Sequence, residues 1–406
     1  MTATAPAIVL AFAFAYFLSA LLRAVTATLA PVFSAELGLG PAELGLLAGA
    51  YFLGFASLQL PLGRALDRHG ARRVLLVLLS VAVAGCAGFA LATSLASLIA
   101  GRLLIGMGVA ACLMAPLTCF RHLFDAGVQL RLNSWMLMTG SLGMVASTVP
   151  VQWLLPYLGW RGLFVALATL LALSMLGIAR FAPRSPAEPT VQPGGRYCEI
   201  MRHPTFVALA PLGFFSYGGL IAIQSLWAGP WLTQVAGWSA AQAAHGLFAI
   251  NLSMLLAFLS WGVVMPRLAR RGVHARHMVT WGVPLSVLAL AAIVMLGARA
   301  GALHWALWCV LSTCVTLSQP FVAQAFPPAW AGRALSAFNL VVFSGVFCLQ
   351  WGIGLAIDAF AALGASRGSA FRAAMAVFAL CCALAQGWFL LRQRRMVIIQ
   401  GRIAPR

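Results

Sequence analysis

Long apolar runs separated by short polar segments recur along the whole chain. Each run has roughly 20 residues, the length that an α-helix needs to cross the hydrocarbon core of a bilayer. The runs do not alternate between polar and apolar positions as half-buried strands do. The pattern predicts twelve membrane-spanning helices, at residues 7–30, 42–62, 74–93, 98–120, 132–152, 162–181, 205–228, 240–264, 278–298, 303–325, 335–358 and 371–391.

One polar segment is much longer than the others. Residues 182–204 are rich in proline, glycine and charge, which is typical of a linker. This linker divides the chain into an N-terminal half, 1–181, and a C-terminal half, 205–392, which is followed by a basic tail, 393–406. We therefore expect an all-α polytopic membrane protein with six helices in each half. The first run lacks a preceding basic segment, so we interpret it as a retained helix rather than a cleaved signal.

The charges are distributed unevenly between the two sides of the predicted bundle. The chain has 26 arginines, no lysine and seven acidic residues, and its net charge is +19. Twenty of the arginines fall on the side of the termini and of the linker. The other side carries Arg161, Arg299, Arg367 and Arg372. Since cytoplasmic loops carry the arginine excess, both termini are predicted to be cytoplasmic, in the inner membrane. The net charge then faces the anionic lipid surface, and we expect no nucleic acid partner.

Signals of several other function classes are missing. The nine cysteines have no spacing that resembles a zinc site or a redox pair. No glycine-rich loop of the nucleotide-binding kind is present. We therefore expect no metal, no cofactor and no enzymatic activity.

The two halves share a loop signature. Residues 63–73, GRALDRHGARR, follow the second predicted span, and residues 265–275, MPRLARRGVHA, follow the eighth. The two segments align with Gly70 opposite Gly272, which indicates an internal duplication. Duplicated halves of this kind are typical of secondary transporters, which bind substrate near the middle of the membrane between the repeats.

Three motifs support a resemblance to a known family. The first loop has the pattern Gly63-x3-Asp67-Arg68-x-Gly70-x-Arg72-Arg73. The fourth span contains Arg102-x3-Gly106-x-Gly108, and the sixth opens with Gly159-Trp160-Arg161. In these places the chain resembles the major facilitator superfamily. The resemblance implies a twelve-helix carrier that works as a monomer by alternating access, with these loop and span-four residues acting in the conformational change.

The resemblance also gives Asp67 a role. It implies that Asp67 meets the start of the eleventh span, where a helix N-terminus carries partial positive charge. With Arg333, Arg68 or Arg121, it would latch the halves together when the cytoplasmic side is shut. The alternative is a solvated loop in which only the arginines matter, for topology. Ala269 replaces the acid in the second copy.

Two arginines lie within predicted spans, and no acid lies at mid-depth. Charges inside a membrane are costly and mark functional sites. Cations without acids favour an anionic solute. Arg23 is predicted to contact that anion or to extend toward the membrane surface. Arg102 is predicted to pack structurally against the first span or to take part in binding, as the family resemblance suggests.

Further polar side chains lie on spans that line the cavity in the family. We expect substrate contacts from Tyr16 on the first span, from Tyr217, Gln224 and Trp227 on the seventh, and from Gln319 on the tenth. Aromatic residues of this kind also form interfacial belts. His245 is a candidate for proton coupling, with simple packing as the alternative.

These features predict a carrier of a small anionic metabolite or inorganic anion. One alternative is a drug or metabolite exporter of the same fold, which the aromatic content favours. Another is a transport-inactive receptor, an assembly factor or a metal importer, suggested by the methionines and cysteines.

Overall fold

The computed structural model describes residues 5–183, 197–272 and 275–403, and every regular element in these ranges is helical. Ten of the helices are long and apolar enough to cross a membrane, or eleven if a bent pair is counted as one span. The described residues therefore form the all-α membrane protein that the sequence predicts.

Eight helices precede the linker. They are α1 (Ala5–Glu36), α2 (Pro41–Ser57), α3 (Gln59–His69), α4 (Ala71–Ala90), α5 (Leu95–Val109), α6 (Met114–Leu123), α7 (Ala126–Ala146) and α8 (Val149–Phe181). α2 and α3 form the second predicted span and meet at an angle of 46°. α5 and α6 together form the fourth.

Ten helices follow the linker, with short irregular turns inserted in some spans. They are α9 (Tyr197–Arg202), α10 (Pro204–Pro211), α11 (Gly218–Ala222), α12 (Ala228–Gln234), α13 (Ala240–Arg270), α14 (Ala275–Leu296), α15 (Ala302–Ser312), α16 (Ser318–Gln324), α17 (Pro328–Ala362) and α18 (Arg367–Ile403). The seventh span contains two π-helical segments, η1 (Leu212–Tyr217) and η2 (Ile223–Trp227). The 3-10 turns are η3 (Gly297–Arg299) and η4 (Thr313–Leu317).

The fifth and sixth spans differ in their boundaries from those that hydropathy predicts. The helix breaks at Ser147 and Thr148, whose hydroxyls donate hydrogen bonds to the carbonyls of Met144 and Val145. These side chains compete with the helical backbone bonds. The next helix, α8, starts at Val149 and contains the true turn between the spans at Gly159, where φ is 62°. Apolar residues continue through both features, so hydropathy alone places the boundaries several residues away.

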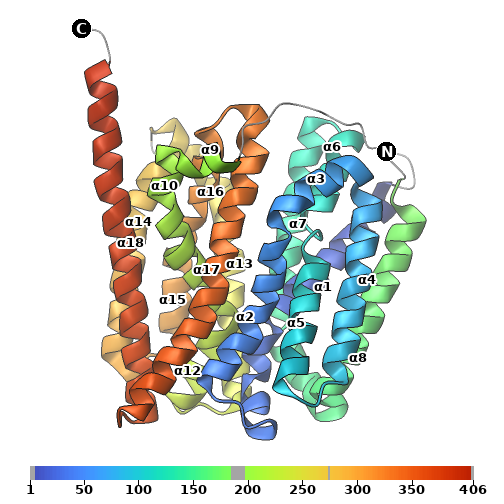
Figure 1. Ribbon diagram of the computed structural model, residues 1–406, viewed down its shortest axis with the longest axis vertical. Coiled ribbons are helices and arrows are strands. Elements are labelled where there is room, and N and C mark those ends of the chain that lie inside the picture. The colour runs from blue at the N-terminus through green and yellow to red at the C-terminus, as the bar shows by residue number, and fades with distance from the viewer. Residues whose placement is uncertain (1–4, 184–196, 273–274, 404–406) are drawn as a thin grey trace.

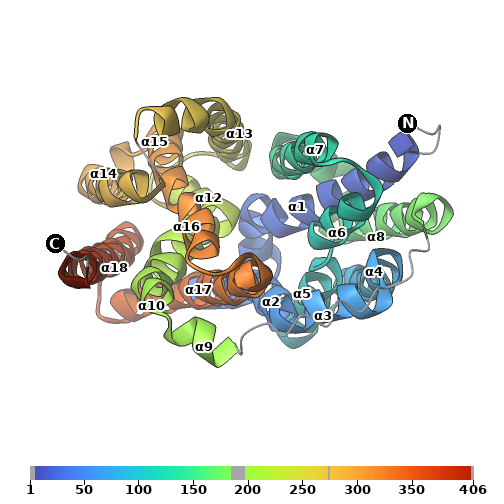
Figure 2. The ribbon, with the colours of Figure 1, turned by 90° about the horizontal axis from the view of Figure 1, so that it is seen from above.

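Both ends of the chain lie on one side of the molecule, with α3, α6 and α9 (Figure 1). We call this side the terminal face and the other side the opposite face. Seen from above, α1–α8 lie on one side of the molecule and α10–α18 on the other (Figure 2). α2 and α17 run beside each other where the two groups meet.

Glycines let the two groups approach closely near the opposite face. A Cβ at Gly45 of α2 would overlap the backbone of Gln350 on α17, and one at Gly354 would overlap the backbone of Pro41. Asp358 of α17 also accepts a hydrogen bond of 2.9 Å from the backbone N–H of Ala42, in the first turn of α2. The opposite face is therefore closed by direct backbone packing between α2 and α17.

Candidate functional site

Arg23 lies among three of the chain's five tyrosines. Tyr16 and Arg23 are both on α1, seven residues apart and therefore on one helix face. Tyr16, Tyr51 and Tyr217 are electrostatic neighbours of the Arg23 guanidinium. Arg23 is partly exposed, and its buried Nε atom has no hydrogen-bond partner. We call these four residues the arginine–tyrosine cluster.

Local features of three helices position the tyrosines. Tyr217 ends the π-helical segment η1, and π-bulges commonly re-aim side chains at functional sites. Gly140 of α7 leaves room for the ring of Tyr16, which a Cβ at that position would contact at 2.5 Å. The Tyr51 hydroxyl donates a hydrogen bond of 3.3 Å to the carbonyl of Ser19, which holds α2 against α1. The cluster therefore joins helices from before and after the linker.

Arg102 is in a different environment from Arg23. Its side chain is only 1% exposed, and Nη1 donates a 3.0 Å hydrogen bond to the carbonyl of Leu22. The guanidinium lies over the rings of Tyr51 and Phe89, at 5.6 and 5.9 Å from their centroids. These contacts hold α5 against α1 and α2. Because a solute cannot reach this guanidinium, the geometry agrees with a structural role for Arg102.

Gly106 supports the same packing one turn further along α5. A Cβ at Gly106 would overlap the carbonyl of Tyr51. The motif of Arg102 and Gly106 therefore fixes the helix that carries Tyr51.

The sequence places no acid in the membrane interior among the residues that the structure describes, so none of these neutralises Arg23 there. Its seven acids lie at the ends of helices or in the linker, at Glu36, Glu43, Asp67, Asp125, Glu188, Glu199 and Asp358. The cluster thus combines a cation with the phenolic hydroxyls of Tyr16 and Tyr217, a combination suited to binding an anion. Tyr51 is 1% exposed and its hydroxyl is hydrogen-bonded to Ser19, so it supports the cluster from behind.

Gln224 and Trp227 contact other helices rather than the cluster. The Gln224 amide donates a 2.7 Å hydrogen bond to Asn251 on α13, and Gln224 is 5% exposed. Trp227 is completely buried and donates to the carbonyl of Gln350 on α17 at 3.2 Å. In this conformation each of the two residues makes a hydrogen bond that links the seventh span to a neighbouring helix.

Gln319 and His245 also lie outside the cluster. Gln319 donates a 2.8 Å hydrogen bond to Asn339, which joins α16 to α17. His245 is exposed near the start of α13, and its Nδ1 atom is 2.8 Å from the carbonyl of Ala241. In the described structure, the hydrogen bonds of Gln319 and His245 do not reach the arginine–tyrosine cluster.

The charged loop after α3 turns as its glycine predicts. Gly70 has a φ of 75°, and the aligned Gly272 has a φ of 79°, so both copies of the loop place a glycine at a positive φ. Arg72 donates a hydrogen bond to the carbonyl of Ala179 at the end of α8. Gly63, in contrast, has open space around it.

The remaining loop residues lie at the terminal face. Asp67, Arg68 and Arg73 are exposed near the α3–α4 turn, and Arg333 lies near the start of α17. In the part of the chain that the structure describes, Arg161 and Glu36 form an ion pair and Asp67 forms none. The latch therefore stays a prediction for another conformation.

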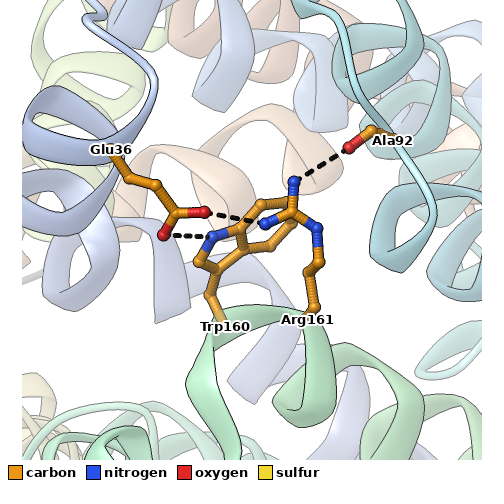
Figure 3. A network of polar contacts seen from close by, with 4 residues as sticks. All are labelled: Glu36, Ala92, Trp160 and Arg161. Carbon is orange, nitrogen blue, oxygen red and sulfur yellow. Dashed lines mark hydrogen bonds and ion pairs between the residues drawn. The ribbon is translucent and has the colours of Figure 1, made fainter.

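A second polar cluster closes the opposite face of the first eight helices. The Glu36 carboxylate accepts hydrogen bonds from the Trp160 indole, at 2.9 Å, and from Arg161, at 2.7 Å (Figure 3). Arg161 also reaches the carbonyl of Ala92 at 3.3 Å. This cluster ties the ends of α1 and α4 to the start of the sixth span, so the Gly159-Trp160-Arg161 motif is structural here.

Two residues of interest were not identified from the sequence. Tyr51 lies in a long apolar run, where a single tyrosine gives no directional signal; the scarcity of tyrosine was the one available clue. Asp358 lies at the end of a span and resembles an ordinary solvated end residue until its contact with α2 is seen.

Comparisons with known proteins agree with the fold. The profile of the Major Facilitator Superfamily matches residues 12–349. The chain is 40% identical over 116 residues to the cephamycin export protein CmcT of Amycolatopsis lactamdurans, covering 29% of this chain and 24% of that protein. It is 29% identical over 161 residues to the 4-hydroxybenzoate transporter PcaK of Acinetobacter baylyi, covering 39% and 34%. The alignments thus span well under half of these relatives' lengths.

Solved structures match over nearly the whole chain, at low identity. A bacterial homologue of the human lysosomal transporter Spinster, inward-facing and unoccupied, superimposes with a TM-score of 0.76 at 18% identity, covering 97% of this chain and 98% of that one. A D-xylose–proton symporter gives 0.73 at 15% identity, covering 94% and 96%. With the family match over most of the sequence, these likenesses show that the chain belongs to the major facilitator superfamily of membrane transporters.

Proposed function

We propose that this transporter is a secondary carrier that binds a small anion at Arg23 and moves it by alternating access. The observation that supports this most is Arg23 itself, a partly exposed cation that no acid in the membrane interior can neutralise. An uncompensated buried charge costs on the order of several kcal/mol. A bound anion supplies the missing charge, so the site favours anions over neutral or cationic solutes.

The surroundings of Arg23 favour an anion with a flat or aromatic body. The planar guanidinium can bind a carboxylate or phosphate with two parallel hydrogen bonds. The ring of Tyr51 stacks near that of Phe55, with centroids 6.3 Å apart, and Phe55 lies 4.5 Å from Phe343 on α17. The relative PcaK is named for 4-hydroxybenzoate, an aromatic carboxylate, which agrees with this interpretation.

Alternating access follows from the placement of the cluster across two parts of the chain. Arg23, Tyr16 and Tyr51 precede the linker, whereas Tyr217 follows it. A solute held between them contacts both halves, so it senses their relative movement. The closed opposite face supports a state open toward the terminal face, which the arginine distribution assigns to the cytoplasm. In this proposal a single chain in the inner membrane is sufficient for transport.

The proposed latch belongs to the reverse state. When the terminal face closes, Asp67 on α3 approaches the start of α17, near Arg333. There the carboxylate meets the positive end of the helix dipole. Arg68 and Arg121 supply further positive charge in this proposal. Asp67→Asn would weaken that state without changing the opposite face.

Flux measurements in proteoliposomes test the proposed function. The probes are labelled 4-hydroxybenzoate, succinate and inorganic phosphate, with 4-hydroxybenzamide as the neutral counterpart. We expect wild-type flux of at least one anion, its loss in Arg23→Gln, and normal flux in Arg299→Gln, which removes an exposed charge at the opposite face. Unchanged anion flux in Arg23→Gln, or preferred flux of the neutral amide, would contradict the proposal.

Export of apolar compounds is the second candidate. The aromatic group of Phe52, Phe55 and Phe343 beside the cluster favours it, as do the names of CmcT and of a multidrug resistance protein, MdtL, that is 29% identical over 170 residues. A deletion strain should then be sensitive to drugs. If the Arg23→Gln variant restored its drug resistance fully, export would be favoured over anion transport.

A further inference from the structure

A groove on the outer side of α3 and α4 has apolar walls and a basic rim. It has a volume of about 280 Å³. Its lining consists of Leu58, Pro61, Leu62, Ala65, His69, Arg73, Val74, Val77 and Leu78. Figure 2 shows α3 and α4 at the edge of the molecule, away from Arg23's helix α1. The groove is therefore separate from the proposed transport site.

The polar and apolar residues of the groove are separated along the membrane normal. His69 and Arg73 lie at the α3–α4 turn, at the terminal face, and both are exposed. Val74, Val77 and Leu78 continue along α4 into the membrane, and Val77 is 58% exposed. At 1.5 Å per residue, Arg73 and Leu78 are separated by about 8 Å along the helix. The groove thus offers positive charge at headgroup level and an apolar channel below it.

We propose that this groove binds one anionic phospholipid, with the phosphate at Arg73 and His69 and an acyl chain between α3 and α4. The exposed apolar side chains of the groove, such as Val77, suit an acyl chain of the surrounding bilayer. Charge complementarity selects an anionic headgroup. The exposed Arg64 and Arg68 on α3 add positive charge nearby, and Asp67 does not line the groove.

The start of α4 agrees with this placement of the phosphate. Its N-cap is Gly70, which provides no side-chain hydrogen bond to the first turn. A headgroup phosphate beside Arg73 would meet the free N–H groups of an uncapped helix.

Native mass spectrometry of the purified full chain tests the proposal. The protein is exchanged into detergent containing phosphatidylglycerol or phosphatidylethanolamine, with inorganic phosphate as a competitor. We expect one retained phosphatidylglycerol, which phosphate does not displace because the acyl chain contributes to binding. Loss of one charge-assisted contact in Arg73→Ala should lower retention about tenfold.

Matched variants separate binding from folding. Val77→Trp fills the groove at an exposed position and should also abolish retention. Arg267→Ala removes the same charge from an exposed position of α13, outside the groove, and Val165→Trp adds the same bulk at a surface position of α8 that is 54% exposed. Both controls should retain the lipid. Equal retention of phosphatidylethanolamine, displacement by phosphate, or full retention in both Arg73→Ala and Val77→Trp would overturn the proposal.

Discussion

At the scale of single residues, the two interior arginines differ in what can reach them. Arg102 is sealed by Tyr51, Phe89 and the carbonyl of Leu22. The Nε atoms of both arginines lack a hydrogen-bond partner, but Arg102 is only 1% exposed, whereas Arg23 is partly exposed. The first arginine therefore holds helices, and the second is available to a solute.

This difference predicts opposite effects of truncation. Arg102→Ala should destabilise the protein by about 2–4 kcal/mol because it leaves a cavity and removes an interhelical hydrogen bond. Arg23→Ala should not destabilise the protein, because it removes a charge that lacks a counter-ion, and it should abolish anion binding. Chemical denaturation and ligand titration of both variants check the pattern. If Arg23→Ala were the destabilised variant and still bound anions, the assignment of roles would be reversed.

Tyr217 should contribute to affinity from the second half of the chain. Removing its hydroxyl in Tyr217→Phe should weaken anion binding roughly tenfold, because a hydrogen bond to a charged group is worth about 1.5–3 kcal/mol. Tyr157→Phe is the control, since Tyr157 is 87% exposed and far from the cluster in sequence. Equal affinities of wild type and Tyr217→Phe for the transported anion would remove Tyr217 from the site.

At the scale of helices, glycines set how closely neighbours pack. Gly106→Ala should destabilise the fold by about 1–3 kcal/mol, because its Cβ would overlap the backbone of Tyr51. Gly88→Ala, on α4, meets no atom within 4 Å and should be neutral or slightly stabilising. Thermal unfolding in detergent compares the two variants. Equal unfolding temperatures would show that α5 can move away without cost.

Asp358 gives the opposite face a capping contact between α17 and α2. Asp358→Ala removes the acceptor for Ala42 N–H and should weaken closure by about 0.5–2 kcal/mol, the value of a helix cap. Glu43→Gln is the control, because Glu43 bonds to Gly40 within the same helix start. Distances between spin labels at the ends of α2 and α17 report the closed fraction. A distribution that shifts equally in both variants would assign the effect to α2 alone.

Hydropathy predicts most of these helices because a membrane imposes their length. It does not predict the break at Ser147 and Thr148 or the turn at Gly159, where apolar residues continue through irregular backbone. The π-helical segments of the seventh span are equally hidden, although they orient Tyr217. Such features arise from tertiary contacts and local side-chain bonds, which hydropathy does not record.

At the scale of the whole molecule, the sequence indicates the fold better than the site. The loop motifs and repeated halves predict the family, and the absence of interior acids makes Arg23 a candidate. The partners of Arg23 depend on which faces of α1, α2 and η1 meet. Tyr16 and Tyr217, which were predicted, and Tyr51, which was not, are all electrostatic neighbours of Arg23. In this conformation Gln224, Trp227 and Gln319 make hydrogen bonds between helices, and their contact with a substrate stays a prediction.

The uncompensated charge also predicts how transport is coupled. The empty carrier must change conformation with Arg23 unneutralised, so its return is slower than that of the loaded carrier. Anion exchange should be faster than net flux by about tenfold for each 1.4 kcal/mol by which the activation free energy of the empty carrier exceeds that of the loaded carrier. Counterflow of the transported anion into preloaded and empty vesicles measures the ratio. Equal rates would show that another group neutralises Arg23 in the empty state.

Thermal unfolding of purified wild type and Arg23→Gln tests the anion site most directly. Both proteins are titrated with 4-hydroxybenzoate, succinate, inorganic phosphate and neutral 4-hydroxybenzamide. A ligand at one hundred times its Kd stabilises a folded protein by about 2.7 kcal/mol. At least one anion should raise the unfolding temperature of wild type without raising that of Arg23→Gln. The amide should change the unfolding temperature of neither protein. The same shift in both proteins, or a shift from the amide alone, would contradict an anion site at Arg23.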